Sequence, residues 1–313
     1  MTVARSVVAS LDGVQEKVPL APFTTFGIGG PARYLAVAQN GAAVERLATW
    51  ASEQQLPWLV LGRGSNVLVD DGGYEGLVII FRRREAQARS IEVNDLRDGS
   101  LRVRADAGTS LAGLARWCSE RGLSGLEWAC GIPGTLGGAV TGNAGAYGSS
   151  MSTVVHTVEV LSDGGRRCSY PSRELGFSYR HSVTLAKGEG LAVLDVALDL
   201  KRGDPESSAA KMAWYSQQRR NSQPKGRSAG CVFRNPAGGS AGALIEACGL
   251  KGFAIGDAVI SDVHANFILN RGQARAEEVL RLMNTARRRV FERFGVRLES
   301  EIRFIGPLSL EVL

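Results

Sequence analysis

The pattern of hydrophobic and polar positions predicts alternating helices and strands over the first part of the chain. Apolar residues recur at helical spacing between residues 42 and 56, which predicts an amphipathic helix. The short apolar run at 57–61 predicts a buried strand, and residues 67–69 predict a second one. Residues 62–66 separate the two strands as a polar loop with two glycines, so small residues and free backbone amides are expected at a strand end.

The alternation continues further along the chain. Polar and apolar residues alternate from 101 to 107, which is the period of a strand with one buried face. Thr109 or Ser110 can cap a helix that follows this strand. Strand-like stretches return at 154–161 and 191–200, so the region combines helices with strands.

A polar stretch at residues 201–208 contains the turn formers Gly203 and Pro205. We place the domain boundary there. The first domain is then expected to span residues 1–203 and the second to span residues 204–313.

The clearest helical pattern in the chain lies at residues 276–294. Its apolar residues step by four, three, four and four positions, which places them on one face: Val279, Met283, Ala286, Val290 and Phe294. Gly295 can end this helix, because glycine takes the left-handed conformation of a helix C-terminus without strain.

Residues 122–148 form the most unusual segment, with nine glycines in 27 residues. Glycine at this density disfavours regular structure, because it costs backbone entropy in helices and strands. A backbone that wraps closely around a ligand, in contrast, benefits from the missing side chains. The segment therefore predicts a binding loop that contains no regular element.

Composition and charge exclude several classes of protein. The 313 residues, 44% of them hydrophobic, suit two compact domains, and a net charge of +6 favours anionic small molecules over nucleic acid. The five cysteines lack the paired spacing of a metal site or a redox motif. No apolar run reaches the length of a membrane span, so we expect a cytoplasmic protein without metal, membrane or nucleic-acid partners.

The loop at residues 62–66 can hold a diphosphate. Gly62 and Gly64 let the backbone approach a ligand closely, and Ser65, Asn66 and the loop amides can donate hydrogen bonds. A tight turn between two strands would use the same residues. Neither this loop nor residues 122–148 have the strand, G-x-G-x-x-G and helix of a Rossmann domain, so that fold is not predicted.

The glycine-rich segment GLSGLEWACGIPGTLGGAVTGNAGAYG resembles the flavin-binding core of the UDP-N-acetylenolpyruvoylglucosamine reductase family. The loop at 62–66 stands where that family contacts the pyrophosphate of FAD. Further motifs follow in family order: TTFGIGGPAR at 24–33, FSYRHS at 177–182, SAGCVFRNP at 228–236, ALIEACGLKG at 243–252, HANFILN at 264–270 and LESEIRFIG at 298–306. The resemblance covers nearly the whole chain, and the compact length is similar to the shorter of the family's two types.

The resemblance implies an α+β fold. A FAD-binding domain of the vanillyl-alcohol-oxidase type would have two lobes, at roughly 1–90 and 91–203, and a smaller α+β substrate domain would follow. Noncovalent FAD is the implied cofactor and NADPH the implied cosubstrate. The implied reaction is the ping-pong reduction of UDP-N-acetylglucosamine enolpyruvate to UDP-N-acetylmuramate in peptidoglycan synthesis, and we expect a monomer.

The same resemblance assigns ligand contacts to particular residues. The implied FAD contacts are Gly62, Arg63, Gly64, Ser65, Asn66, Gly131, Ile132, Pro133, Gly134, Gly137, Gly138, Asn143 and Gly145. The implied substrate contacts are Tyr179, Arg220, Asn235, His264 and Asn266.

Three residues form the expected catalytic group. Hydride addition to the methylene carbon of the enolpyruvyl group leaves negative charge at its carboxylate, which needs cationic or hydrogen-bonding support. The family's motifs give this task to Arg180, with Glu301 beside it, and the final protonation to a serine. This chain has Cys231 at the serine position, and a thiol can act as that acid while it stays protonated.

Other interpretations stay open from the residues alone. Arg180 and Glu301 could be members of surface ion pairs, and Cys231 could be a small apolar core residue. His156 and His181 have no partner pattern and are expected to be structural. The alternative functions are an FAD oxidoreductase of the same fold with another substrate, a noncatalytic flavin- or nucleotide-binding module, and an RNA-binding protein.

Overall fold

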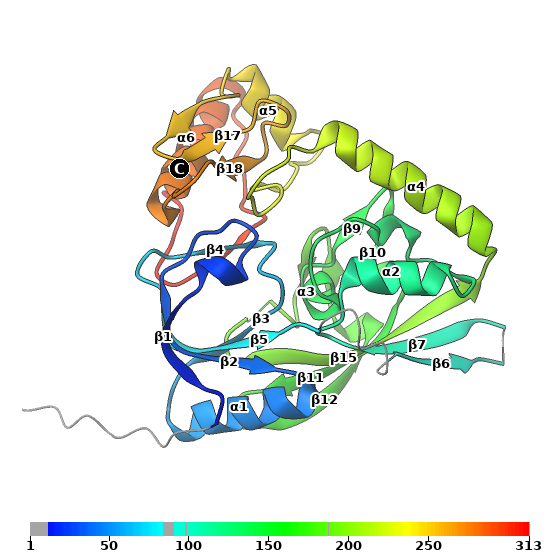
Figure 1. Ribbon diagram of the computed structural model, residues 1–313. Helices are drawn as coiled ribbons and strands as arrows, with labels where there is room; N and C mark the ends of the chain where they lie inside the picture. Colours follow the sequence, from blue (N-terminus) through cyan, green and yellow to red (C-terminus); the bar gives the residue numbers. More distant parts are fainter. Residues whose placement is uncertain (1–11, 84–90, 98, 187, 313) are drawn as a thin grey trace, which may run out of the picture.

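The molecule consists of two sheets with their helices and a C-terminal part that stands beside them (Figure 1). The computed structural model describes residues 12–83, 91–97, 99–186 and 188–312. No helix within these ranges is long and apolar enough to cross a membrane.

The first sheet contains, in spatial order, β1 (Gln15–Pro19), β2 (Pro31–Ala38), β5 (Tyr74–Phe81) and β3 (Trp58–Leu61). β2 and β3 run parallel to β5, whereas β1 is antiparallel to β2. Helix α1 (Gly41–Glu53) packs on this sheet with its apolar side, including Val44 and Leu47, buried. The helix and the strand β3 confirm the elements expected from the periodicity.

The second sheet contains, in spatial order, β12 (Arg166–Pro171), β11 (Val155–Ser162), β15 (Leu191–Arg202), β7 (Leu101–Asp106) and β6 (Ile91–Asp95), and β8 (Leu123–Ser124) also pairs with β15. All neighbours in it are antiparallel. Helix α2 (Leu111–Ser119) follows β7, and Ser110 is its N-cap because its side chain accepts a hydrogen bond from the Gly113 amide. Both sheets contribute to one large hydrophobic core.

The glycine-rich segment contains regular structure, so the expectation of a loop without any is wrong. Helix α3 (Leu136–Thr141) lies within it, preceded by the 3-10 turn η3 (Glu127–Ala129). The Thr135 side chain caps α3 by accepting from the Gly138 amide, and Leu136 and Val140 are fully buried. Capping and burial of the apolar positions outweigh the entropic cost of the glycines.

The C-terminal part contains α5 (Ala241–Ala247), a small sheet of β16 (Ala254–Ile255), β17 (Ala258–Ile260) and β18 (Ile268–Asn270), and α6 (Ala276–Phe294). α6 has the limits expected from sequence, and Gly295 follows it with a left-handed φ of 68°. β19 (Arg303–Ile305) then returns to the first half of the chain, where it pairs in parallel with β4 (Val67–Val69). The domain limits 1–203 and 204–313 stay a prediction.

Short elements complete the described chain. They are η1 (Ala21–Phe23), η4 (Met151–Thr153), η5 (Ser172–Glu174), the pair β9 (Gly145–Ala146) and β10 (Ser149–Ser150), and the pair β13 (Phe177–Ser178) and β14 (His181–Ser182).

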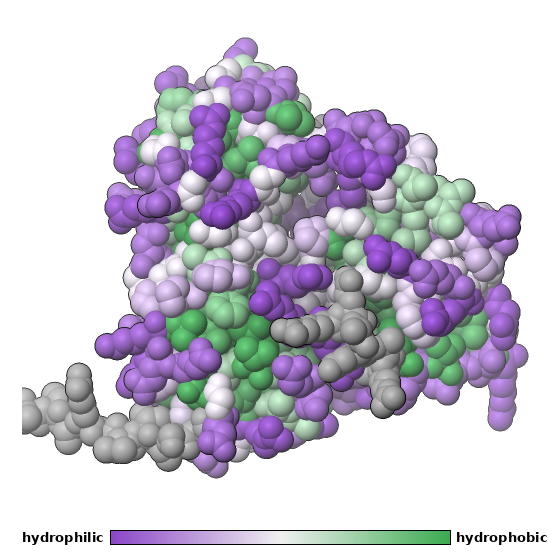
Figure 2. All heavy atoms as spheres, in the orientation of Figure 1, coloured by the Kyte–Doolittle hydropathy of each residue, from purple (hydrophilic) through white to green (hydrophobic). Residues whose placement is uncertain are grey.

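Helix α4 (Pro205–Ser222) was not expected, because its first residues were assigned to a polar boundary segment. Asp204 caps it by accepting a hydrogen bond from the Ser207 amide, and Pro205 fits the first turn of a helix. Ser208 is its one fully buried residue among the 18 of the helix. Hydrophilic side chains cover the end of α4 that faces the C-terminal part (Figure 2). The helix therefore lacks the apolar stripe that periodicity detects.

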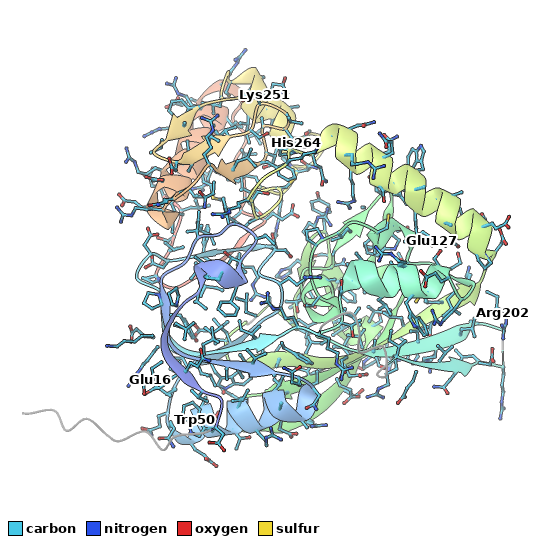
Figure 3. All side chains as sticks on the ribbon, viewed as in Figure 1. Glu16, Trp50, Glu127, Arg202, Lys251 and His264 are labelled. Atoms are coloured by element: carbon cyan, nitrogen blue, oxygen red, sulfur yellow. The ribbon has the colours of Figure 1, made fainter. Side chains whose placement is uncertain are left out.

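A buried carboxylate fastens α4 to the rest of the molecule. Glu127 lies between α4 and α2 (Figure 3) and is 8% exposed. Its carboxylate accepts hydrogen bonds from the Ser124 hydroxyl at 2.7 Å, the Gly125 amide at 2.8 Å and the Ser208 hydroxyl at 2.9 Å. Burial by itself would raise the pKa of Glu127, but these hydrogen bonds outweigh it and hold the pKa below its ordinary value.

Replacement of Glu127 by Gln is expected to lower the free energy of unfolding by about 1–3 kcal/mol, because the amide presents donors where the carboxylate accepts. The loss should be present at neutral pH, where the Glu127 carboxylate is ionised. It should shrink as the pH falls below about 4, because the wild-type carboxylate then becomes protonated and the stability that came from its lowered pKa is lost. Chemical denaturation at several pH values measures both effects.

Glu120→Gln is the matched control, since this carboxylate is 61% exposed. It should change stability little at any pH. Equal losses in both variants would contradict the role given to Glu127.

Candidate active site

A cavity of about 1130 Å³ opens between the two sheets and the C-terminal part. Its lining includes residues of the loop at 62–66, of the glycine-rich stretch 131–147, and of segments 222–231 and 301–306. This volume exceeds the roughly 300–1,000 Å³ of pockets that hold one small ligand. The cavity is therefore large enough for an extended ligand.

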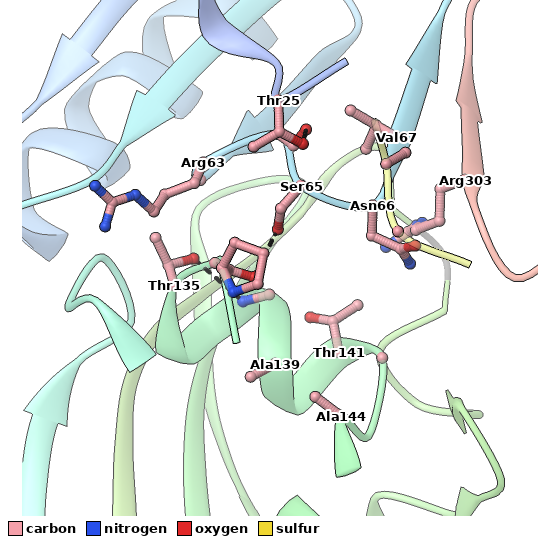
Figure 4. Close-up of a pocket in the computed structure, with 18 of the residues that line it drawn as sticks. Thr25, Arg63, Ser65, Asn66, Val67, Thr135, Ala139, Thr141, Ala144 and Arg303 are labelled. Carbon is pink, nitrogen blue, oxygen red and sulfur yellow. Dashed lines mark hydrogen bonds between the residues drawn. The ribbon is translucent and has the colours of Figure 1, made fainter. Parts of the chain in front are cut away.

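The two glycine loops contact each other directly on one wall of the cavity (Figure 4). The Ser65 hydroxyl donates to the Pro133 carbonyl at 2.9 Å. A Cβ at Gly62 would stand 2.4 Å from the Thr135 hydroxyl oxygen, and a Cβ at Gly64 would stand 2.4 Å from the Phe23 carbonyl oxygen. Both distances are too short for any side chain, so glycine at 62 permits the close approach of the two loops, and glycine at 64 permits the close packing of the first loop against Phe23.

Gly138 has a different reason to be glycine. A Cβ there would meet only the Thr135 hydroxyl oxygen, at an ordinary 3.5 Å, and Gly138 lines the cavity. Any larger side chain would therefore project into the cavity and leave the surrounding packing unchanged. This wall presents backbone to a ligand.

The C-terminal strand brings further groups to the same loop. The Asn66 side chain donates to the Glu301 carbonyl at 3.1 Å, and the Arg303 amide donates to the Asn66 carbonyl at 3.0 Å. Figure 4 shows Arg303 beside Asn66. These bonds extend the parallel pairing of β4 with β19 and place Glu301 in the cavity.

Arg180 and Glu301 form an ion pair in the cavity. Arg180 stands in the two-residue turn between β13 and β14 with a φ of 55°, and its guanidinium donates to the Gly145 carbonyl at 2.7 Å. Its Nε is 3.1 Å from a Glu301 carboxylate oxygen, although the angle is outside that of a hydrogen bond. Burial raises the pKa of Glu301, while Arg180 and Arg234 oppose that rise.

Cys231 lines the cavity near this ion pair. Burial, together with the nearby Glu301 carboxylate, raises the pKa of its thiol to about 12. Arg180, Arg219 and a hydrogen bond with Asn266 lower the pKa of the thiol, but their combined effect is smaller than that of burial and Glu301. The thiol therefore stays protonated throughout the physiological pH range, as an acid must.

Arg219 lines the cavity, whereas the expected Arg220 does not. Arg220 is exposed and donates to the Gln217 side chain at 2.7 Å. The Arg219 side chain runs alongside Gly131, and its Nε is buried without a hydrogen-bond partner in the described part of the protein. Its electrostatic influence reaches Cys231 and Arg180. The cavity thus holds a cation available for an anionic ligand.

The remaining predicted contacts are located around the cavity and do not line it. Asn143 donates to the Ser178 carbonyl at 2.8 Å, next to the turn that carries Arg180. The Asn266 amide bonds to both backbone groups of Phe233, at 3.0 and 2.8 Å. These two asparagines position the segments of Arg180 and Cys231.

The other predicted substrate contacts have different surroundings. Asn235 accepts from the Ala241 amide at the start of α5. His264 packs edge-on against Phe267, and Tyr179 is exposed beneath the Arg180 guanidinium. His156, expected to be structural, lies 2.9 Å from the Asp199 carboxylate on the second sheet.

Sequence reasoning missed Thr135, Tyr147, Arg219 and Arg303 among the residues that line the cavity. Thr135 and Tyr147 stand within the glycine-rich segment, and Arg303 within the motif of Glu301. The described residues contain no group of three or more potential ligands that could hold a metal ion.

Comparisons with known proteins agree with this arrangement. Residues 32–169 match a family described as FAD binding domain, and residues 222–305 match "UDP-N-acetylenolpyruvoylglucosamine reductase, C-terminal domain". Curated proteins named UDP-N-acetylenolpyruvoylglucosamine reductase are similar over most of the chain. The one from Chloroflexus aurantiacus is 43% identical over 290 residues (92% of this chain, 96% of the relative), and that from Heliobacterium modesticaldum is 44% identical over 299 residues (95% and 92%).

A solved structure is similar as well. The crystal structure of UDP-N-acetylenolpyruvylglucosamine reductase from Thermus caldophilus has a TM-score of 0.76 and 40% identity, and the match covers 93% of this chain and 98% of that one. The matches, together with the mixed helices and strands, confirm the expected α+β fold with a FAD-binding domain. The backbone-lined wall and the volume of the cavity fit that cofactor.

Gly138→Val is expected to weaken FAD binding about tenfold or more, because overpacking costs about 1–3 kcal/mol and here falls on the ligand. Flavin absorbance per mole of purified protein, followed by titration of the apoprotein with FAD, measures the change. The melting temperature of the apoprotein should stay close to that of the wild type.

Gly41→Val provides the control. Its Cβ would make an ordinary 3.6 Å contact with Leu194, away from the cavity. Full flavin content in Gly138→Val, or an equal loss in Gly41→Val, would show that Gly138 does not border the cofactor.

Proposed function

Because the chain belongs to the UDP-N-acetylenolpyruvoylglucosamine reductase family and is an FAD-dependent oxidoreductase, we propose that NADPH is its hydride donor and UDP-N-acetylglucosamine enolpyruvate its substrate. The product is then UDP-N-acetylmuramate, a precursor of peptidoglycan. The observation that carries the proposal is the convergence of Arg180, Glu301 and a protonated Cys231 in the cavity. We keep the monomeric state as a prediction.

The proposed FAD site lies along the wall built by the two glycine loops, with Gly62, Gly64, Ser65, Gly134 and Gly138 among its residues. FAD bound there supplies the two-electron chemistry that passes hydride from NADPH to the enolpyruvyl group. The protein itself holds the reacting carbon in place, supports the charge that develops and delivers the proton.

Arg180 and Glu301 are proposed to govern the developing charge. When hydride reaches the methylene carbon, negative charge spreads onto the substrate carboxylate, and the Arg180 guanidinium can stabilise it. The Gly145 carbonyl and the Glu301 carboxylate fix that guanidinium beforehand, so little reorganisation is needed. Arg219 supplies a second cation for the anionic groups of the substrate.

Cys231 is proposed to complete the reaction. Its thiol gives a proton to the carbon beside the carboxylate, so that hydride and proton together saturate the double bond. The thiolate that remains regains a proton from solvent before the next cycle. Burial raises the pKa of the thiol and so makes the thiolate a strong base, which favours its reprotonation by solvent.

The proposed function is tested with the purified holoenzyme. We expect NADPH consumption to require UDP-N-acetylglucosamine enolpyruvate and one UDP-N-acetylmuramate to form per NADPH. NADH serves as the comparison donor. Flavin reduction by NADPH without turnover of this substrate would indicate an oxidoreductase with another substrate, and failure of NADPH to reduce the flavin would reject the donor.

Cys231→Ala should leave flavin reduction by NADPH nearly unchanged and slow reoxidation by the enolpyruvyl substrate by about a hundredfold or more, because only the second half-reaction needs the acid. Cys231→Ser should keep substantial activity. Since the neutral thiol is the active form and its pKa is about 12, the wild-type reoxidation rate should show no decline from thiol ionisation up to about pH 10. Stopped-flow traces across pH measure both half-reactions.

Cys168→Ala, a thiol on β12 away from the cavity, is the control and should match the wild type. An unchanged reoxidation rate in Cys231→Ala would assign the proton to another group.

A further inference from the structure

Helix α4 presents aromatic side chains at the edge of the cavity. Tyr147, which lines the cavity, is stacked on Tyr215 of α4 with ring centroids 4.3 Å apart and planes 27° apart. Trp214 of α4 meets both rings edge-on, at 5.8 and 5.3 Å. We call these three residues the aromatic cluster.

The aromatic cluster is held in a fixed position. The Tyr147 hydroxyl donates to the Tyr215 carbonyl at 3.2 Å, and Tyr147 adopts a φ of 52° between β9 and β10. α4 is fastened by the Ser208–Glu127 hydrogen bond and by the Cys130 thiol, which donates to the Met212 carbonyl at 3.3 Å. A surface held this way loses little entropy when a ligand binds.

The cluster is open to solvent despite its fixed position. Trp214 is 56% exposed and Tyr147 is 40% exposed, whereas Tyr215 packs partly against the core. The two exposed rings adjoin each other and so form a contiguous exposed patch, which is more informative than a single exposed apolar residue. Two aromatic side chains thus remain accessible at the edge of a cavity that receives planar ligands.

An unpaired cation adjoins these rings. Arg219 is one helical turn beyond Tyr215, and its guanidinium carbon is 5.9 Å from the centre of the Tyr147 ring. Its Nε has no hydrogen-bond partner among the described residues, and no carboxylate in the described ranges forms an ion pair with it. Aromatic faces beside a free guanidinium match the chemistry of a nucleotide, with its planar base and its phosphate.

We propose that Trp214 and Tyr147 stack the base of a nucleotide diphosphate while Arg219 binds the diphosphate. This inference rests on the proposed function, which brings two such ligands to the cavity: the uridine nucleotide of the sugar substrate and the dinucleotide NADPH. The shared chemistry is a planar heterocycle linked to a diphosphate. The base lies against α4, and the rest of the ligand extends into the cavity toward Arg180.

The test titrates the holoenzyme and its Trp214→Ala variant with UDP, NADP+ and inorganic pyrophosphate, with calorimetry as the readout. Stacking on an aromatic side chain contributes enough to predict about tenfold weaker binding of the base-containing ligand in Trp214→Ala. Pyrophosphate binding should be unchanged, because that probe has no base. Trp214→Phe should recover most of the affinity.

Phe253→Ala is the matched control, since this aromatic side chain is 42% exposed and lies outside the cavity. Flavin content and melting temperature verify that every variant is folded. Weaker binding of UDP alone assigns the cluster to the sugar nucleotide, and weaker binding of NADP+ alone assigns it to the dinucleotide.

Two results would overturn the inference. Unchanged affinity for both nucleotides in Trp214→Ala rejects stacking while the proposed function stands, because the wild type still binds them. An equal loss of pyrophosphate affinity also rejects it, since the defect would then be unrelated to a base. If the wild type bound neither nucleotide, the proposed function and this inference would both fall.

Discussion

The close contact between two glycine loops is the constraint on which the rest of the site depends. The loop at 62–66 comes from the first sheet, and residues 131–138 lead into α3 beside the second. Because a Cβ at Gly62 would collide with Thr135, the two loops can pack this closely on one wall of the cavity only with glycine at that position, and Ser65 then bonds to the Pro133 carbonyl. The Asn66 bonds to the C-terminal strand start from this wall, so the position of Glu301 follows from it as well.

Much of the fold could be predicted from the sequence where apolar residues repeat with a clear period. α1, α6 and the strands β3 and β7 have buried faces that match their patterns, and Gly295 ends α6 as expected. α4 could not be predicted this way, because a helix that buries only one residue fully leaves no apolar stripe. α3 was hidden by its glycines, whose cost is offset by a Thr135 cap and by tertiary burial that a local pattern does not contain.

The sequence predicts which segments form the site more reliably than which individual side chains line it. The glycine loops, Arg180, Cys231 and Glu301 all line the cavity. Motif position could not separate Arg219 from Arg220, because successive helical residues point about 100° apart and only the packing of α4 shows which one faces inward. Likewise, the sequence identifies the opposing charges of Glu301 and Arg180 near Cys231, but it does not show that burial raises the pKa of the thiol.

The bond between Asn66 and the Glu301 carbonyl joins positions 235 residues apart, and the parallel pairing of β4 with β19 spans a similar separation. Contacts of such high sequence separation form late and slowly in folding, since the loop-closure entropy must be overcome before they add stability. During synthesis from the N-terminus, both glycine loops emerge long before Glu301 does. A nascent chain can therefore build the wall of the cavity well before it acquires the carboxylate proposed for catalysis.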